Sequence, residues 1–225
     1  MLIINDLILY YKKILFTNNL KFVITTLTDD IFSIADPILN RFCINILPKI
    51  HYNVKSLILD SISMEKILLA GDYPNLTQLK LFNFNGKIVS RYFTCESPFR
   101  HIFQEQIADL ILVFEKNFNA ISNKLYATNL YGYVFNFFVN LKHLSIIGLF
   151  PYRVPCLKFR QLPLTICFHS TLYKLSLSVQ NLEDCYALLD GRLKQLTTLI
   201  LHIVQPEYSE YYSSNINNMV SFILY

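Results

Sequence analysis

Six stretches of the chain share one order of residues: apolar, two variable, apolar, one variable, apolar. They are VKSLIL, LTQLKL, IADLIL, LKHLSI, LYKLSL and LTTLIL, which begin at residues 54, 76, 107, 141, 172 and 196. Alternate residues of a strand point to opposite faces, so the fourth and sixth positions are expected to turn inward together. Strands of this kind stacked in parallel bury a continuous core that one strand does not bury alone. The pattern therefore predicts a series of parallel strands.

The spacing of these stretches is uneven along the chain. The first two stretches begin 22 residues apart and the last two 24, within the range of about 20–29 residues that leucine-rich repeats use. The three intervals between them are 31, 34 and 31 residues long, so insertions are expected there. The sequence thus predicts an α/β fold, an irregular leucine-rich-repeat solenoid with parallel strands and short return helices.

Three segments between the stretches favour return helices. Residues 63–70 place their apolar side chains on one helical face and end before Gly71, a typical helix stop. Residues 182–189 do the same and follow Asn181, a suitable N-cap. Residues 132–138 are a strongly aromatic third candidate. Strands that alternate with helices indicate a parallel sheet.

One feature of common leucine-rich repeats is missing, the Asn or Cys three places after the sixth position. The residues at that place are Ile62, Phe84, Glu115, Leu149, Gln180 and Val204. We therefore expect the turns to be satisfied by their own backbone or by helices.

We expect two regions in the chain. Residues 1–50 are predicted to form an N-terminal helical segment, in which residues 1–16 and 20–32 are the helical candidates. Residues 51–225 are predicted to form the leucine-rich-repeat domain of about six repeats. The apolar residues 219–225 predict the start of another strand, in which case the chain stops inside its repeat array.

The composition is 53% hydrophobic and 16% charged, against roughly 25% charged residues in an average domain. Membrane insertion and an elongated core are the two explanations. The longest apolar runs, residues 7–16 and 131–139, are interrupted by polar residues and fall short of the ~20 that a spanning helix needs. Asn5 and Asp6 precede the first run, and no small-residue cleavage site follows it. We expect no membrane insertion and an intracellular location, cytoplasmic or nuclear.

Little in the sequence points to catalysis, so we expect no enzyme, cofactor or metal site. The five Cys are scattered without a C-x-x-C pair, which argues against a disulfide framework and a structural zinc site. Glycine-rich phosphate loops and the common hydrolase motifs are absent. Cys167 and His169 lie two residues apart, but no third group orients them, so a structural cysteine is favoured. The net charge of +4 and pI of 8.7, without a basic stripe, argue against nucleic-acid binding.

Three motifs carry a resemblance to a known family: FCINILP at residues 42–48, NLKHLSI at 140–146 and LLDGRLKQL at 188–196. With the repeats they resemble F-box proteins with irregular leucine-rich repeats, above all the large expanded group of such proteins in rotifers. The resemblance implies an F-box that docks the Skp-type adaptor of a cullin–RING ubiquitin ligase, and repeats that select the substrate. No Leu-Pro precedes Leu47-Pro48, so we expect the F-box to be missing or truncated. The alternative is a stand-alone scaffold, or a truncated family member without a ligase role.

The third, fifth and seventh positions of the repeats are expected to line one face of the sheet, where a protein partner would bind. An apolar patch with a polar rim typically marks such an interaction site. The predicted patch consists of Phe82, Ile111, Val113 and Ile147, rimmed by Lys80, Asp109 and His143. The alternative is that a loop or terminal segment covers this face. An open face predicts that Phe82→Asp leaves the thermal midpoint nearly unchanged, whereas a covered face predicts a large drop.

Two insertions are further candidates for binding loops. Residues 115–130 are rich in Asn with interleaved aromatic residues, and residues 151–163 contain three Pro with basic residues nearby. Long loops in compact domains are often functional. For both segments a passive surface loop is the favoured interpretation.

Overall fold

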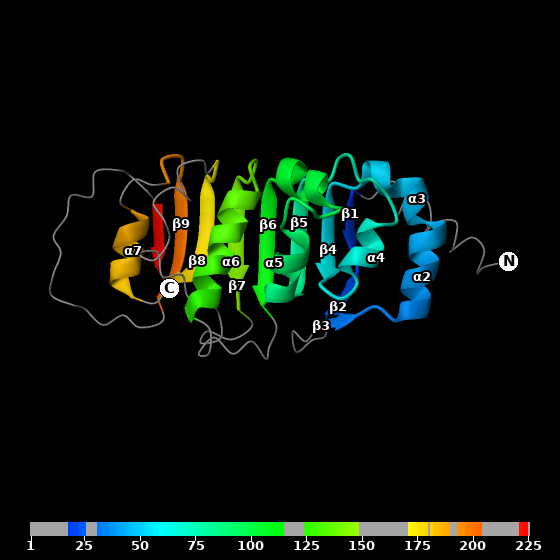
Figure 1. Ribbon diagram of the computed structural model, residues 1–225, viewed down its shortest axis with the longest axis horizontal. Coiled ribbons are helices and arrows are strands. Elements are labelled where there is room, and N and C mark those ends of the chain that lie inside the picture. The colour runs from blue at the N-terminus through cyan, green and yellow to red at the C-terminus, as the bar shows by residue number, and fades with distance from the viewer. Residues whose placement is uncertain are drawn as a thin grey trace. The chain divides into compact units, whose positions relative to one another are not determined.

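The computed structural model describes residues 18–25, 31–114, 124–148, 171–179, 181–189, 193–203 and 221–224. The chain forms two compact units, Met1–Phe82 and Asn83–Tyr225. Both units are α/β, with parallel strands and short helices (Figure 1). Among the described residues, no helix is long and apolar enough to cross a membrane.

The first unit combines parallel strands with a short antiparallel hairpin. Strands β1, β4 and β5 lie in that order and pair in parallel, while β2 and β3 form a separate two-stranded sheet. The elements are β1 (Asn19–Lys21), β2 (Val23–Thr25), β3 (Ile31–Ser33), α2 (Asp36–Asn45), α3 (Leu47–Ile50), η1 (His51–Asn53), β4 (Ser56–Asp60), α4 (Met64–Leu68) and β5 (Gln78–Phe84), whose last two residues belong to the second unit.

The second unit contains five parallel strands in chain order, from β6 to β10. Its helices α5 and α6 lie on one side of the strands in Figure 1. The elements are α5 (Gly86–Tyr92), η2 (Ile102–Gln106), β6 (Asp109–Phe114), α6 (Lys124–Phe137), β7 (His143–Ile147), β8 (Lys174–Val179), α7 (Leu182–Leu188), β9 (Thr198–Ile203) and β10 (Ser221–Leu224).

All six predicted stretches form strands, and their fourth and sixth positions are buried. None of these twelve side chains is more than 3% exposed. They are Leu57, Leu59, Leu79, Leu81, Leu110, Leu112, Leu144, Ile146, Leu175, Leu177, Leu199 and Leu201. Burial of one such side chain contributes about 1.5–3 kcal/mol relative to leaving it exposed. The inward column predicted from the pattern is confirmed.

The starts of five strands, β4, β5, β7, β8 and β9, are each fixed to the neighbouring strand by one recurring backbone arrangement. The carbonyl at the second position accepts hydrogen bonds from two consecutive N–H groups, those of the second and third positions of the next strand. Lys142 O, for example, accepts from the N–H groups of Tyr173 and Lys174 at 2.8 and 3.1 Å. The other acceptors are Asn18, Lys55, Ala108 and Tyr173. This arrangement sets the register, because a shift of one residue would break both bonds.

A side-chain ladder reinforces the same edge. The residue just before the first position donates to a carbonyl of the preceding repeat: Asn75 Nδ2 to Tyr52 O at 2.6 Å, and Asn140 Nδ2 to Glu105 O at 2.7 Å. Thr171 Oγ1 occupies the same place and donates to Leu141 O at 2.6 Å. At these three places the polar ladder therefore lies before the strand, on the opposite side from the place where common repeats carry their Asn.

After three strands, polar side chains accept hydrogen bonds from backbone N–H groups of the turn, so the turns do not depend on backbone acceptors alone. Asn85 accepts from Lys87 N–H at 3.1 Å, and Asn181, the predicted N-cap, accepts from Asp184 N–H at 3.0 Å. After β4, the carboxylate of Asp60 accepts from Ile62 N–H at 3.1 Å. Each accepting side chain substitutes for a missing backbone partner at the start of the return segment.

The insertions in the second unit supply an aromatic core. Asn83 has a positive φ of 52°, a conformation that Asn tolerates better than most residues. This interrupts the strand alternation, and the fully buried Phe84 contacts Phe93 and Phe114 at centroid distances of 5.9 and 5.3 Å. Phe93 also contacts Phe138 edge to face at 4.9 Å. The longer repeats thus use their extra residues to fill the space beneath the sheet.

The structure also tests three predictions about other parts of the chain. The helix predicted for residues 20–32 is wrong: this range contains β2, most of β1 and most of β3, because β1 pairs with β4 and β2 pairs with β3. Residues 115–130 were expected to be a loop, yet residues 124–130 belong to α6. The predicted strand near the end is confirmed, since β10 pairs in parallel with β9.

Replacement of Asn140 by Ala should lower the free energy of unfolding by about 1 kcal/mol, because the Glu105 carbonyl loses its side-chain donor. Chemical denaturation measures this difference. Asn136→Ala, at an exposed position of α6, is the matched control and should not destabilise the protein. Equal stability of Asn140→Ala and the control would show that the ladder contributes nothing.

Candidate protein-binding face

The side chains at the third, fifth and seventh positions of the strands form one face of each sheet, which we call the outer face. Its exposure falls along the strands. The third positions are exposed or half-buried and the fifth positions are all half-buried. Four of the six seventh positions are buried, namely Asp60, Phe82, Val113 and Ser178. The accessible part of the outer face therefore lies near the starts of the strands.

In the first unit, the outer face holds two of the predicted site residues, Lys80 and Phe82. Lys80 pairs in register with Ile58, and Phe82 pairs with Asp60. The Lys80 ammonium lies 4.8 Å from the centre of the Phe82 ring, a cation–π geometry. The predicted exposure of Phe82 is wrong, because only 7% of it is accessible.

The buried Asp60 beside Phe82 ties the end of β4 to the hairpin. Its carboxylate accepts hydrogen bonds from the Ser33 hydroxyl on β3 and from the Ile62 N–H. A buried carboxylate is stable only when such donors surround it. This corner of the first unit is therefore structural, and Phe82 belongs to it.

In the second unit, the other five predicted residues lie together on β6 and β7. Asp109 pairs in register with His143, and Val113 pairs with Ile147, while Ile111 lies between them. His143 Nδ1 lies 3.7 Å from Asp109 Oδ2. These neighbours confirm the predicted arrangement of the face, though not its use.

The predicted residues on β6 and β7 differ in how exposed they are. Ile147 is 41% exposed and Ile111 is half-buried, but Val113 is only 2% exposed, so its predicted exposure is wrong. The physical reason is that both faces of β6 are covered near its end, where the consecutive residues Leu112, Val113 and Phe114 are all buried, as Leu81 and Phe82 are on β5. Alternation in a sequence indicates which face a side chain is on, but not what covers that face.

The predicted patch covers β5 to β7 and leaves out the same face of β8 and β9. Ser145, Ser176 and Ile200 are half-buried and adjacent in register across three strands. Lys174 and Thr198 lie beside His143 in the row of third positions. The alternation that identifies the patch also marks these residues, but most of them are polar and so do not stand out as part of an apolar patch.

The described residues offer little that resembles a catalytic centre. No group of His, Cys, Asp and Glu within them is arranged to hold a metal ion. Burial raises the pKa of the Cys43 and Cys185 thiols, which disfavours the reactive thiolate. The pair Cys167 and His169 and the segment of residues 151–163 lie outside the described residues, as do residues 115–123. The accessible outer face presents ionic, hydroxyl and half-buried apolar groups on strands that pair in register.

No protein-family model and no curated protein matches this chain.

Replacement of Phe82 by Asp should lower the free energy of unfolding by about 3 kcal/mol or more, since it removes a buried ring and buries a carboxylate beside Asp60. Ile147→Asp, at an exposed position of the outer face, should change it by less than about 1 kcal/mol. Urea denaturation of both variants measures the difference. Equal effects would mean that the burial described for Phe82 is wrong.

Proposed function

We propose that this chain is a leucine-rich-repeat-type solenoid that binds another protein through the outer face of its second unit. The repeat interpretation is supported by the two-donor hydrogen-bond arrangement, which recurs at five strand starts. It is also supported by the leucines and isoleucines at the fourth and sixth positions of six strands.

One observation carries the binding proposal. The third and fifth positions of β6 to β9 form two adjacent accessible rows, and the strands beneath them are held in register. The first row contains Asp109, His143, Lys174 and Thr198, and the second contains Ile111, Ser145, Ser176 and Ile200. Mixed polar and apolar surfaces of this kind are typical of protein interfaces. A face that is already ordered loses little conformational entropy on binding. We propose binding and not catalysis because the two rows present polar and apolar groups that can recognise a partner.

The resemblance to F-box proteins extends this proposal to a substrate-recognition role in a cullin–RING ubiquitin ligase, with a Skp-type adaptor as second partner. One feature of the first unit supports it: Ile38 and Ile44 on α2 are 63% and 73% exposed, and exposed apolar side chains often mark interaction sites. The motif at residues 42–48 runs from α2 into α3. A scaffold without a ligase role remains the alternative proposal.

The binding face is tested with Ser145→Tyr/Ser176→Tyr, which puts two bulky uncharged side chains in the middle of the second row. Proteins captured from the source cells by the unmodified chain should be lost from this variant, because the large side chains prevent close contact. The matched control is Ser90→Tyr/Asn136→Tyr, at exposed positions of α5 and α6 in the same unit. Circular dichroism establishes that all three chains are folded. Retention of the same proteins by the outer-face variant would contradict the proposal.

Adaptor binding is tested separately with a purified Skp-type adaptor. The chain should retain the adaptor, and Ile38→Glu/Ile44→Glu should abolish retention, because two charges replace exposed apolar contacts on α2. Asn40→Glu, an exposed position on the same helix, is the control and should still bind. If the folded, unmodified chain fails to retain the adaptor, the ligase role is wrong and the scaffold proposal stands.

A further inference from the structure

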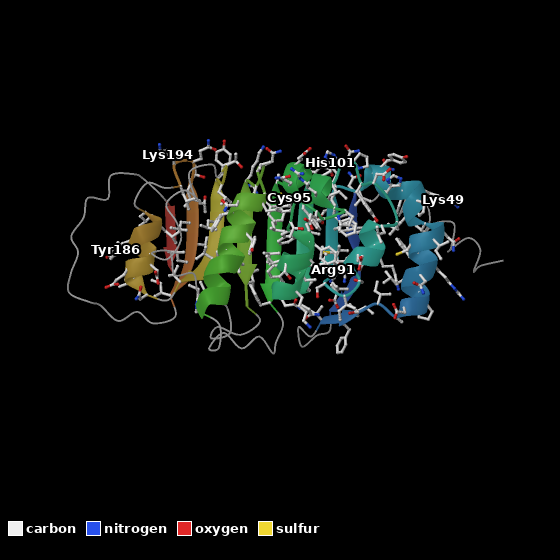
Figure 2. All side chains as sticks on the ribbon, viewed as in Figure 1. Lys49, Arg91, Cys95, His101, Tyr186 and Lys194 are labelled. Atoms are coloured by element: carbon white, nitrogen blue, oxygen red, sulfur yellow. The ribbon has the colours of Figure 1, made fainter. Side chains whose placement is uncertain are left out.

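Three lysines gather where strands β7, β8 and β9 begin, and we call them the lysine edge. Lys142 directly precedes β7, Lys174 is the first residue of β8, and Lys194 lies in the turn that leads to β9. All three are exposed. Figure 2 shows Lys194 at the edge of the second unit where His101 also lies. The three ammonium groups therefore come from consecutive repeats along one border of the sheet.

The backbone beneath the lysine edge is held in place. Lys142 O accepts from the N–H groups of Tyr173 and Lys174, and Tyr173 O accepts from those of Thr197 and Thr198. The three lysines do not share one row of the register, because Lys174 pairs with His143 and Thr198, whereas Lys142 directly precedes His143 and Lys194 comes four residues before Thr198. Their flexible stems can still adjust the position of each charge.

The charge of this edge is not compensated within the described residues. None of the salt bridges that they form includes Lys142, Lys174 or Lys194. Strands β7, β8 and β9 contain no Asp or Glu. The nearby acids Asp109 and Glu105 lie beside imidazoles, with Asp109 Oδ2 3.7 Å from His143 Nδ1 and Glu105 Oε2 2.8 Å from His101 Nδ1. The described part of this border is thus positive over three strands.

The side chains beside the lysines can bind a peptide. Ser145 and Ser176 offer hydroxyl groups for hydrogen bonds, Ile200 offers half-buried apolar surface, and Tyr173 is 44% exposed. Three lysines neutralise too few phosphates to hold a nucleic acid tightly, and a single exposed tyrosine gives little platform for stacking bases. An extended peptide places every second side chain on one side, about 6.8 Å apart, within reach of flexible lysine side chains.

We propose that the lysine edge binds an acidic segment of the protein partner, in which Glu or Asp recurs at every second residue. This inference rests on the proposed binding function of the outer face and deepens it by naming the chemistry of the partner. The carboxylates pair with the lysines, and the residues between them lie over the two serines.

The test uses the full chain and a fluorescein-labelled peptide of alternating Glu and Ser, measured by fluorescence anisotropy at low salt. The triple variant Lys142→Gln/Lys174→Gln/Lys194→Gln should bind it about tenfold more weakly, as expected for the loss of three exposed charge pairs. The matched variant Lys49→Gln/Lys55→Gln/Lys87→Gln removes the same charge from exposed positions elsewhere and should change binding by less than about twofold. A peptide of alternating Gln and Ser should not bind.

Equal weakening in the two triple variants would overturn the inference, because it would show attraction to net charge alone. Displacement of the peptide by an oligothymidylate of equal charge at lower concentration would overturn it in favour of a nucleic acid. The proposed function has its own readout, the loss of captured protein in Ser145→Tyr/Ser176→Tyr. If that loss occurs while the lysine-edge variant still captures the partner, the acidic peptide is wrong and the binding face stands.

Discussion

Everything in this structure depends on how one strand begins beside the next. At five strand starts, a single carbonyl accepts two consecutive N–H groups, and at three of the junctions a polar side chain just before the strand bonds to the preceding repeat. This edge determines the register, and the register determines which side chains are inside. Because the fourth and sixth positions then stack on one another, insertions of different length between strands leave the core column intact.

The alignment of the strand starts also explains why the exposure of the outer face changes along the strands. The strand starts lie side by side at a border that polar residues occupy, so the third positions are open to solvent. Toward the strand ends, four of the six seventh positions are buried, and the first unit shows one way: the hairpin serine and the turn after β4 both donate to the buried carboxylate of Asp60. Recognition groups are therefore concentrated near one border, where Lys142, Lys174 and Lys194 also lie. We propose that position along the strand, more than residue type, selects which outer-face residues meet a partner.

Much of the fold could be predicted from local pattern. The six strands, their inward residues, the return helices after β4 and β8, the cap at Asn181 and the strand at Ser221–Leu224 all follow from periodicity and capping rules. Strand β1 was missed because Thr17 occupies the place where the pattern requires an apolar residue. The polar ladder was missed because it lies before the strand and joins residues 23 to 35 positions apart. Alternation places Phe82 and Val113 on the outer face but does not indicate whether that face is covered, so this pattern alone could not predict their burial.

The central proposal is that a protein partner contacts the outer face of the second unit near the strand starts. Its most direct test is site-specific photo-crosslinking, with p-benzoylphenylalanine at Ser145 on the outer face or at Asn136 on the exposed side of α6. The account predicts that, after irradiation in the source cells, Ser145 forms a covalent adduct with one partner protein and Asn136 does not. Adducts at Asn136, with none at Ser145 in an equally folded chain, would contradict it.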